Sequence, residues 1–212
     1  MSRKCLIIAA LVSMLAGFSA YGRGEVLRYA FSAGYINSLE SIRADYDGGE
    51  TQYLSGNFGG VYLGAGIHSA PFGKQSFTLS ADLDFKHLSG LLHDRTVWEN
   101  FIFAPVRLGY GFEVVSFGLD ESLIIEPYAG PVLQYGLSSK TSDYNFYRPD
   151  GQLKSDHFNV LFGAGVRLVL NKRFALDAGY DIGLLPRYEL KGDGYSYRWS
   201  TSNFHVGLSY RF

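Results

Sequence analysis

Eight segments of this chain alternate apolar and polar side chains at every second residue. Successive side chains of a β-strand point to opposite faces, so each segment would present one apolar face and one polar face. Between residues 76 and 87, for example, Leu83 and Phe85 point one way, whereas Asp82 and Asp84 point the other way. The alternation predicts strands in Val26–Ile36, Phe58–His68, Ser76–His87, Asn100–Phe112, Leu123–Leu137, Phe158–Leu170, Phe174–Leu184 and Ser200–Phe212.

The composition also indicates an all-β chain, with 16 Tyr, 16 Phe and 26 Gly among 212 residues. After the N-terminal segment, no window of about 18 apolar residues occurs, which excludes transmembrane helices. Strands of about ten residues with one apolar face are typical of membrane-spanning barrels, which have an even number of strands in single-chain bacterial proteins. We therefore predict an eight-stranded, antiparallel, up-and-down transmembrane β-barrel. A soluble barrel or sandwich is the alternative.

The lengths of the connections between the predicted strands alternate. Barrels of this class have short turns on the periplasmic side and longer loops outside the cell. A chain that begins in the periplasm would place its odd-numbered connections outside. The long or polar connections are 37–57, 88–99, 138–157 and 185–199, the short ones are 69–75 and 171–173, and 113–122 is intermediate.

The N-terminus has the layout of a secretory signal peptide. Arg3 and Lys4 precede an apolar run over residues 5–18, and Ala20 and Gly22 lie at a plausible cleavage site. The run is shorter than the roughly 20 residues that a spanning helix requires. We predict a signal peptide over residues 1–22 and one barrel domain over 23–212, so that Cys5 would be removed with the signal.

The last predicted strand has a continuous apolar face and ends on an aromatic residue. A terminal aromatic of this kind resembles the sorting signal that barrels show to the barrel assembly machinery. The sequence thus predicts the outer membrane of a Gram-negative cell, with outer-membrane lipid and lipopolysaccharide as neighbours. The candidate signal residues are Phe204, Val206, Leu208, Tyr210 and Phe212.

Three prolines interrupt the fourth and fifth predicted strands. Pro105, Pro127 and Pro131 cannot donate to a β-ladder, and a closed barrel has no free edge on which to place them. We therefore expect them at bulges or near strand ends.

The same prolines carry a family resemblance. The segments APVRLGY (104–110) and EPYAGPVLQYG (126–136) resemble the Pro-aliphatic-aromatic hairpin of the "porin family" of outer-membrane β-barrel proteins of Bacteroidota. With the N-terminal signal and the terminal Phe, the resemblance covers essentially the whole chain. It implies a small barrel and hardly specifies a function, since the word porin in the family label is no evidence of a pore.

The predicted inward face is rich in charge. An eight-stranded barrel is only wide enough to be filled by its own side chains or one small ligand. Buried charges are costly unless they are paired, so we expect a network of ion pairs that takes the place of an apolar core. Its predicted members are Arg28, Asp82, Asp84, Lys86, Arg107, Glu126, Arg167, Asp177, Asp181 and Arg211, and we expect Arg211 to pair with Asp177 or Asp181.

One group of residues could be enzymatic. His87 and Ser89 lie at the outer end of the third strand, and Glu99 follows ten residues later. A serine beside a histidine that a carboxylate orients is the arrangement that acyl hydrolysis requires, and it resembles the catalytic group of outer-membrane lipid A deacylases. Interfacial residues that cap a strand would have the same composition. Glu99 also falls on the opposite parity if the fourth strand begins early.

Nothing else in the sequence points to a defined chemistry. Basic and acidic residues are balanced at 19 and 20, which gives no indication of nucleic-acid binding, and we expect no cofactor and no metal. We expect a monomer that has a structural or adhesive role and presents its loops to an unknown surface ligand. A narrow solute channel and a lipid-modifying hydrolase are the alternatives. An aromatic girdle at the membrane boundary is expected from Tyr53, Trp98, Tyr144, Phe146, Tyr147, Tyr188, Tyr195, Tyr197 and Trp199.

Overall fold

The computed structural model describes residues 27–69, 75–92, 95–117, 122–141, 157–192 and 194–212. The predicted signal peptide and three of the predicted girdle residues, Tyr144, Phe146 and Tyr147, lie outside this part of the chain. No helix of the described residues is long and apolar enough to cross a membrane. The strands are β1 (Leu27–Tyr46), β2 (Thr51–Ser69), β3 (Gln75–Leu92), β4 (Arg95–Ser116), β5 (Ser122–Lys140), β6 (Phe158–Leu170), β7 (Phe174–Gly183), β8 (Tyr188–Gly192) and β9 (Tyr195–Arg211).

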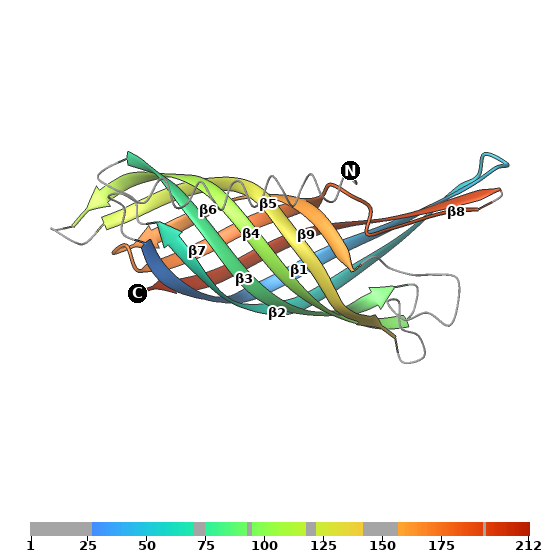
Figure 1. Ribbon diagram of the computed structural model, residues 1–212, viewed down its shortest axis with the longest axis horizontal. Helices are drawn as coiled ribbons and strands as arrows, with labels where there is room; N and C mark the ends of the chain where they lie inside the picture. The colour runs from blue at the N-terminus through green and yellow to red at the C-terminus, as the bar shows by residue number, and fades with distance from the viewer. Residues whose placement is uncertain (1–26, 70–74, 93–94, 118–121, 142–156, 193) are drawn as a thin grey trace.

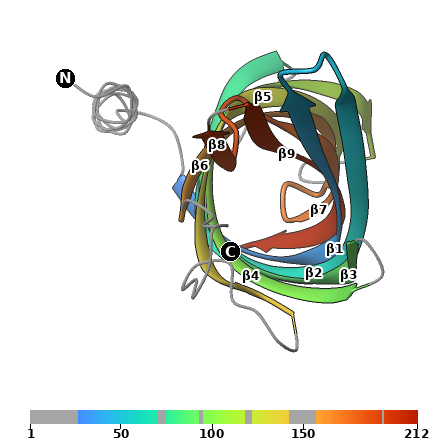
Figure 2. The same cartoon turned by 90° about the vertical axis from the view of Figure 1, so that its right-hand side faces the viewer.

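The strands form a closed antiparallel ring. Each strand from β1 to β6 pairs with the next, and β9 pairs with both β7 and β1, which closes the ring (Figures 1 and 2). The C-terminal half of β9 pairs with β7, whereas its N-terminal end pairs with β8. Since β7 and β8 thus share one position, the ring has eight positions, and the predicted eight-stranded up-and-down barrel is confirmed.

The barrel wall separates side chains by parity into two environments. On the outside, large apolar side chains remain exposed, among them Tyr29 at 71%, Leu63 at 64% and Leu208 at 66%. On the inside, charged groups such as Glu126 and Arg211 are buried at 1% and 0% exposure. This is the reverse of a soluble protein and matches the predicted directions of the strand faces.

Several strands are longer than the alternation predicts. The expected loop 37–57 is mostly a β-hairpin, in which β1 and β2 continue to a turn at residues 47–50. The expected loop 185–199 contains β8 and the start of β9. These segments lie side by side and form a four-stranded sheet that projects far beyond one end of the barrel (Figure 1). At the opposite end, Asn171 and Lys172 have positive φ angles of 52° and 56°, as a tight hairpin turn requires.

The prediction that prolines would mark bulges or strand ends is wrong. Pro105, Pro127 and Pro131 lie inside β4 and β5. Next to Pro105, the β3–β4 ladder lacks two pairs, yet it resumes in the same register. The register shifts between β4 and β5 occur elsewhere, between Asn100 and Phe101 and between Glu113 and Val115. The missing donors therefore weaken the ladder locally without displacing the strands.

The depth of an outward side chain in the membrane should decide how a charge is tolerated there. Leu83 lies midway along β3 and Leu91 near its outer end, and they are similarly exposed at 59% and 62%. Arginine at the middle of a bilayer costs a barrel about 2–4 kcal/mol, and near the boundary about 0–1 kcal/mol. We expect Leu83→Arg to lower the free energy of unfolding in lipid vesicles by that larger amount and the matched Leu91→Arg to have little effect. Urea titration measures both, and equal losses would contradict the membrane orientation.

Candidate functional site

The barrel interior is arranged in layers along its axis. The inward residues of β4 show the order, since Glu99 is followed by Phe101, Phe103 and then Arg107. Charged groups therefore lie toward both ends, and an aromatic layer lies between them. The strand alternation predicts which side chains face inward, and most of the charged residues it singles out are buried in the structure.

The layer nearest the 171–173 turn is a network of ion pairs whose members lie on several strands. Arg167 donates to Glu126 Oε1 at 2.5 Å and to Asp177 Oδ2 at 3.2 Å. The Tyr128 hydroxyl donates to Asp177 Oδ1 at 2.9 Å, and the Arg167 guanidinium lies 5.1 Å from the centre of the Tyr128 ring. Because each carboxylate oxygen of Asp177 meets a donor, its buried charge is compensated.

Arg211 pairs with partners other than the predicted ones. Its Nη2 lies 3.5 Å from Glu126 Oε2, and its Nε donates to His68 Nδ1 at 3.2 Å. His68 Nε2 is in turn 2.7 Å from Asp82 Oδ1, so this ring nitrogen carries the proton. The expected pairing of Arg211 with the seventh strand is wrong because its long side chain crosses the lumen to β5 and β2.

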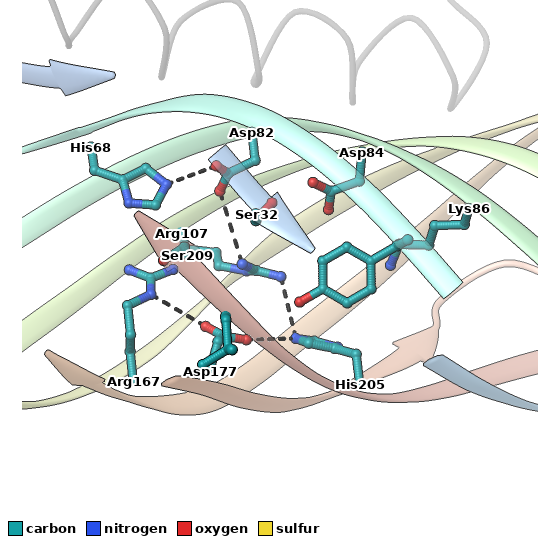
Figure 3. A pocket seen from close by; sticks show the side chains of 12 residues that line it. Ser32, His68, Asp82, Asp84, Lys86, Arg107, Arg167, Asp177, His205 and Ser209 are labelled. Atoms are coloured by element: carbon teal, nitrogen blue, oxygen red, sulfur yellow. Dashed lines mark hydrogen bonds and ion pairs between the residues drawn. The ribbon is translucent and has the colours of Figure 1, made fainter. Parts of the chain in front are cut away.

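A second histidine lies between two carboxylates. His205 Nε2 is 3.1 Å from Asp177 Oδ1 (Figure 3), and its Nδ1 is 3.6 Å from Asp181 Oδ2. Arg107 Nη2 approaches the same Nε2 at 3.4 Å. His205 therefore links β9 to the carboxylates of β7 and to Arg107 of β4.

Two predicted members of the network are placed differently from the rest. Arg28 lies at the barrel rim, where it donates to the backbone oxygen of Lys172 at 3.0 Å. Lys86 is fully inside, and its Nζ lies 3.7 Å from the centre of the Phe103 ring, a cation–π contact at the boundary of the aromatic layer. Without Arg28, four basic side chains of the predicted set face five acidic ones.

The network encloses a small cavity. Its volume is about 20 Å³, enough for about one water molecule, and its walls include Asp82, Asp84, Arg107 and His205 (Figure 3). Space is limited because side chains approach one another closely. The Tyr62 ring, for example, crosses the directly paired Gly34 and Gly207, where an added Cβ would collide with it.

The aromatic and aliphatic layer was not predicted. Phe58, Phe101 and Phe103 are at most 1% exposed and pack with Leu88 and Leu161 in one apolar cluster. Phe101 and Phe103 share the inward parity of Arg107, so the extended alternation of β4 carries a signal for them. A wholly polar interior was expected, but the interior contains an apolar plug that separates two groups of polar side chains.

A second group of charges closes the lumen at the end with the projecting sheet, and most of it was not predicted. Arg187, in the connection between β7 and β8, is 1% exposed, with Nη2 2.5 Å from Glu99 Oε1 and Nη1 3.6 Å from Glu40 Oε1. Trp199 Nε1 and the Thr201 hydroxyl donate to Glu40 Oε2 at 2.7 and 2.6 Å. The break in alternation before Arg187 was the only sequence signal for this inward segment.

The structure does not bring together the three candidate catalytic residues. His87 and Ser89 share the outward face of β3, whereas Glu99 faces the lumen. Glu99 accepts from the Ser139 hydroxyl at 2.6 Å and from Arg187. His87 Nδ1 instead lies 2.8 Å from Oδ1 of Asn100. A carboxylate-oriented triad of the predicted kind is therefore not formed.

The projecting sheet contains aromatic residues that were expected in a girdle. Tyr195 and Tyr197 lie on this projection, and the Tyr46 and Tyr197 hydroxyls are 3.2 Å apart. This hydrogen bond raises the pKa of Tyr46. Two other predicted girdle residues, Tyr188 and Trp199, are buried inside the barrel at 9% and 4% exposure, since they share the inward parity of β8 and β9.

Comparison with protein-family models and with curated proteins gives no match. Among solved structures, the chain is similar to Ail, the attachment invasion locus protein of Yersinia pestis, with 14% identity and a TM-score of 0.36 over 85% of this chain and 98% of Ail. It is also similar to Neisserial surface protein A, with 13% identity and a TM-score of 0.33 over 86% and 99% of the two chains. The N-terminal β-barrel domain of Pseudomonas aeruginosa OprF is similar as well, with 16% identity and a TM-score of 0.34 over 84% of this chain and 97% of that domain. Similarity at this level carries no functional argument. The architecture itself is established by the strand pairing described above.

Removal of one central arginine should destabilise the barrel strongly. Arg167→Met removes the guanidinium that Glu126 and Asp177 share, although Glu126 keeps the longer contact to Arg211, and breaking a buried pair in this way typically costs about 3–5 kcal/mol. We expect such a loss in the free energy of unfolding, followed by the fluorescence of Trp98 and Trp199 in urea. Arg173→Met, at an exposed turn position, is the matched control and should unfold like the wild type. An unchanged stability of Arg167→Met would show that the network is not required.

Proposed function

We propose that this chain is an outer-membrane β-barrel protein with a closed interior, which has a structural or adhesive role at the cell surface. One observation carries the proposal, namely the exposed apolar belt that surrounds a buried, charge-paired lumen. A water-soluble protein would not expose such a belt, whereas a barrel wall in lipid requires it. The predicted signal peptide and terminal aromatic strand support export and assembly by the barrel assembly machinery.

The projecting sheet would lie outside the cell, and the short 171–173 turn would lie in the periplasm. The long and short connections support this orientation. About five residues of β1 and of β2 extend past the last β2–β3 pair, which at about 3.3 Å per residue places the turn some 15–20 Å beyond the wall. A monomer would thereby present a rigid sheet to a surface ligand. Membership of the Bacteroidota porin family, which the proline hairpin suggests, is part of this proposal.

A solute channel is the weaker alternative. Three layers close the lumen. They are the ion pairs of Arg187 with Glu40 and Glu99, the apolar cluster around Phe101 and Phe103, and the ion-pair network. The network leaves a cavity of about 20 Å³. We expect no discrete conductance in planar bilayers, since three successive layers would have to move for an ion to pass.

Cysteine labelling tests the orientation directly. The only cysteine of the sequence, Cys5, lies in the predicted signal peptide, so a single introduced thiol can be followed. Gly48 at the tip of the projection has no atom within 4 Å of an added Cβ, and Arg173 lies at the opposite end. We expect a membrane-impermeant maleimide to label Gly48→Cys in intact cells and Arg173→Cys only after the outer membrane is opened. Labelling of Arg173→Cys in intact cells would contradict the proposal, and wild type is the control.

A shortened hairpin separates a structural role from an adhesive one. Ile42 and Leu54 face each other directly, so an Asn-Gly turn between them can replace residues 43–53. We expect a deletion strain to take up more of a fluorescent hydrophobic dye. Rescue by both the full and the shortened chain would indicate a structural role, and rescue by the full chain alone would indicate a role of the projection. Unchanged dye uptake in the deletion strain would contradict a role in membrane integrity.

A further inference from the structure

A row of directly paired residues crosses the outward face of the barrel near its outer end. It runs through Tyr35, Val61, His87, Asn100 and Ser138 on strands β1 to β5. Four of the five are polar or amphipathic, whereas outward residues deeper in the wall are apolar. A polar row on the lipid side of a barrel calls for an explanation other than packing.

The depth of this row follows from β3. Phe77, Leu79, Leu83 and Phe85 form its apolar outward face, and His87 comes next. From Phe77 to His87, ten residues at about 3.3 Å with a tilt of about 40° rise by about 25 Å, which is the height of the apolar band of a barrel. The polar row therefore lies where hydrocarbon meets headgroups, the level at which acyl esters of membrane lipids are found.

Hydrogen bonds fix the protonation pattern of His87. Asn100 Nδ2 donates to the Ser138 hydroxyl at 2.7 Å, so its Oδ1 is the atom that faces His87 Nδ1 at 2.8 Å. The amide oxygen can only accept, hence Nδ1 carries the hydrogen and Nε2 keeps a free lone pair. Asn100 thus prepares His87 as a general base, as an asparagine does in cysteine–histidine–asparagine triads.

A serine shares the face of β3 with this base, two residues further along the strand. Ser89 follows His87 on the same outward face of β3, one pleat closer to the outer end. Its direct neighbours are Trp98 on β4 and Gly59 on β2. Gly59 has no side chain, and the Tyr35 hydroxyl occupies the space above it, whereas the exposed Trp98 ring can lie at the headgroup boundary.

Two hydrogen-bond donors lie beside Gly59. The Tyr35 hydroxyl lies over Gly59, 2.8 Å from the place that a Cβ would occupy. Asn37, the residue paired with Gly59 on its other side, donates from Nδ2 to this hydroxyl at 3.4 Å. Tyr35 and Asn37 thus bring two neutral donors to the side of Gly59 opposite Ser89, as stabilisation of an oxyanion requires.

We propose that Ser89, His87 and Asn100 form a membrane-facing site that hydrolyses fatty-acyl esters of outer-leaflet lipids. Ser89 is the nucleophile, His87 is the general base, and Asn100 is a positioning residue that acts through His87. The inference rests on the proposed outer-membrane location, which brings lipid esters to this wall. It replaces Glu99 of the predicted triad by its neighbour, because only Asn100 shares the outward parity of His87.

The chemistry balances with water as the second substrate. Ser89 Oγ attacks the ester carbonyl carbon while His87 Nε2 takes the hydroxyl proton, and Tyr35 and Asn37 donate to the resulting oxyanion. The bond to the lipid alcohol then breaks, and His87 returns the proton to that alcohol. Water, deprotonated by His87, releases the fatty acid from Ser89 and restores the hydroxyl.

Covalent labelling tests the nucleophile independently of the lipid. We expect a fluorophosphonate probe to modify Ser89 of the refolded protein in vesicles, as located by mass spectrometry. Ser89→Ala should abolish labelling, and His87→Ala should slow it by about 100-fold or more. Ser41→Ala, an outward serine of the projection, is the matched control and should label normally. Heat-dependent gel migration of every variant shows that the barrel has formed, so that misfolding is distinguished from loss of the site.

The role of Asn100 has its own signature. Asn100→Ala should slow labelling, whereas Asn100→Asp should restore it with a pH midpoint shifted upward, because a carboxylate stabilises the imidazolium. A merely structural Asn100 would leave the midpoint unchanged in Asn100→Asp, which would overturn its positioning role.

Lipid substrates decide the activity and its source. Vesicles of phosphatidylethanolamine and purified lipopolysaccharide are incubated separately with the protein, and released fatty acids are measured by mass spectrometry. Release from either lipid that Ser89→Ala abolishes supports the proposal and identifies a glycerophospholipid or an acylated saccharide as the substrate. Release from neither lipid by folded wild-type protein overturns it, while the barrel proposal would still stand on the labelling of Gly48→Cys and Arg173→Cys.

Discussion

The pairing of β1 with β9 is the constraint on which the rest of the structure depends. In a hydrocarbon environment each backbone donor and acceptor must find a partner within the chain, and only a closed ring provides this for strands. Closure then assigns every side chain to one of two environments by parity alone. Successive side chains point to opposite faces, so Phe31 and Leu208 face outward, whereas their sequence neighbours Ser32 and Ser209 face the lumen. The packing and the charges inside follow from this division.

The narrow lumen determines how its charges are used. Water has little access, so Glu126, Arg167 and Asp177 compensate one another directly. Apolar side chains could also fill a lumen of this size, but here Phe101 and Phe103 form an apolar layer only in its middle. Charged groups at both ends enclose that apolar plug and tie strands from opposite sides of the ring. Among the described residues, these layers leave a cavity of about 20 Å³ inside the wall, so the loops and the outer wall offer more room for contact with other molecules.

Alternation in the sequence is sufficient to predict the directions of side chains but not their partners. The inward positions of Asp82 and Arg107 follow from a period of two residues. The contact between Arg211 and Glu126 does not, because strand tilt and stagger bring residues together across the lumen that no local pattern connects. Arg187 escaped prediction for a different reason, since it lies where the alternation stops and the chain turns inward. Strand length was underestimated in β1 because the pattern reverses beyond the apolar belt, where outward Ser41 and Arg43 are polar and inward Ile42 is apolar.

The outer wall shows how parity also limits candidate catalytic groups. Glu99 and Asn100 are neighbours in the sequence, but they point in opposite directions. Glu99 binds Arg187 in the lumen, whereas Asn100 contacts His87 on the lipid side. Spacing along the chain suggested a carboxylate as the third member of the triad, and strand register selects the amide instead. In a barrel wall, a triad can only be assembled from residues that share a face and occupy adjacent rows. His87, Ser89 and Asn100 meet both conditions, and the bond from Asn100 to Ser138 gives the imidazole the tautomer that a general base requires.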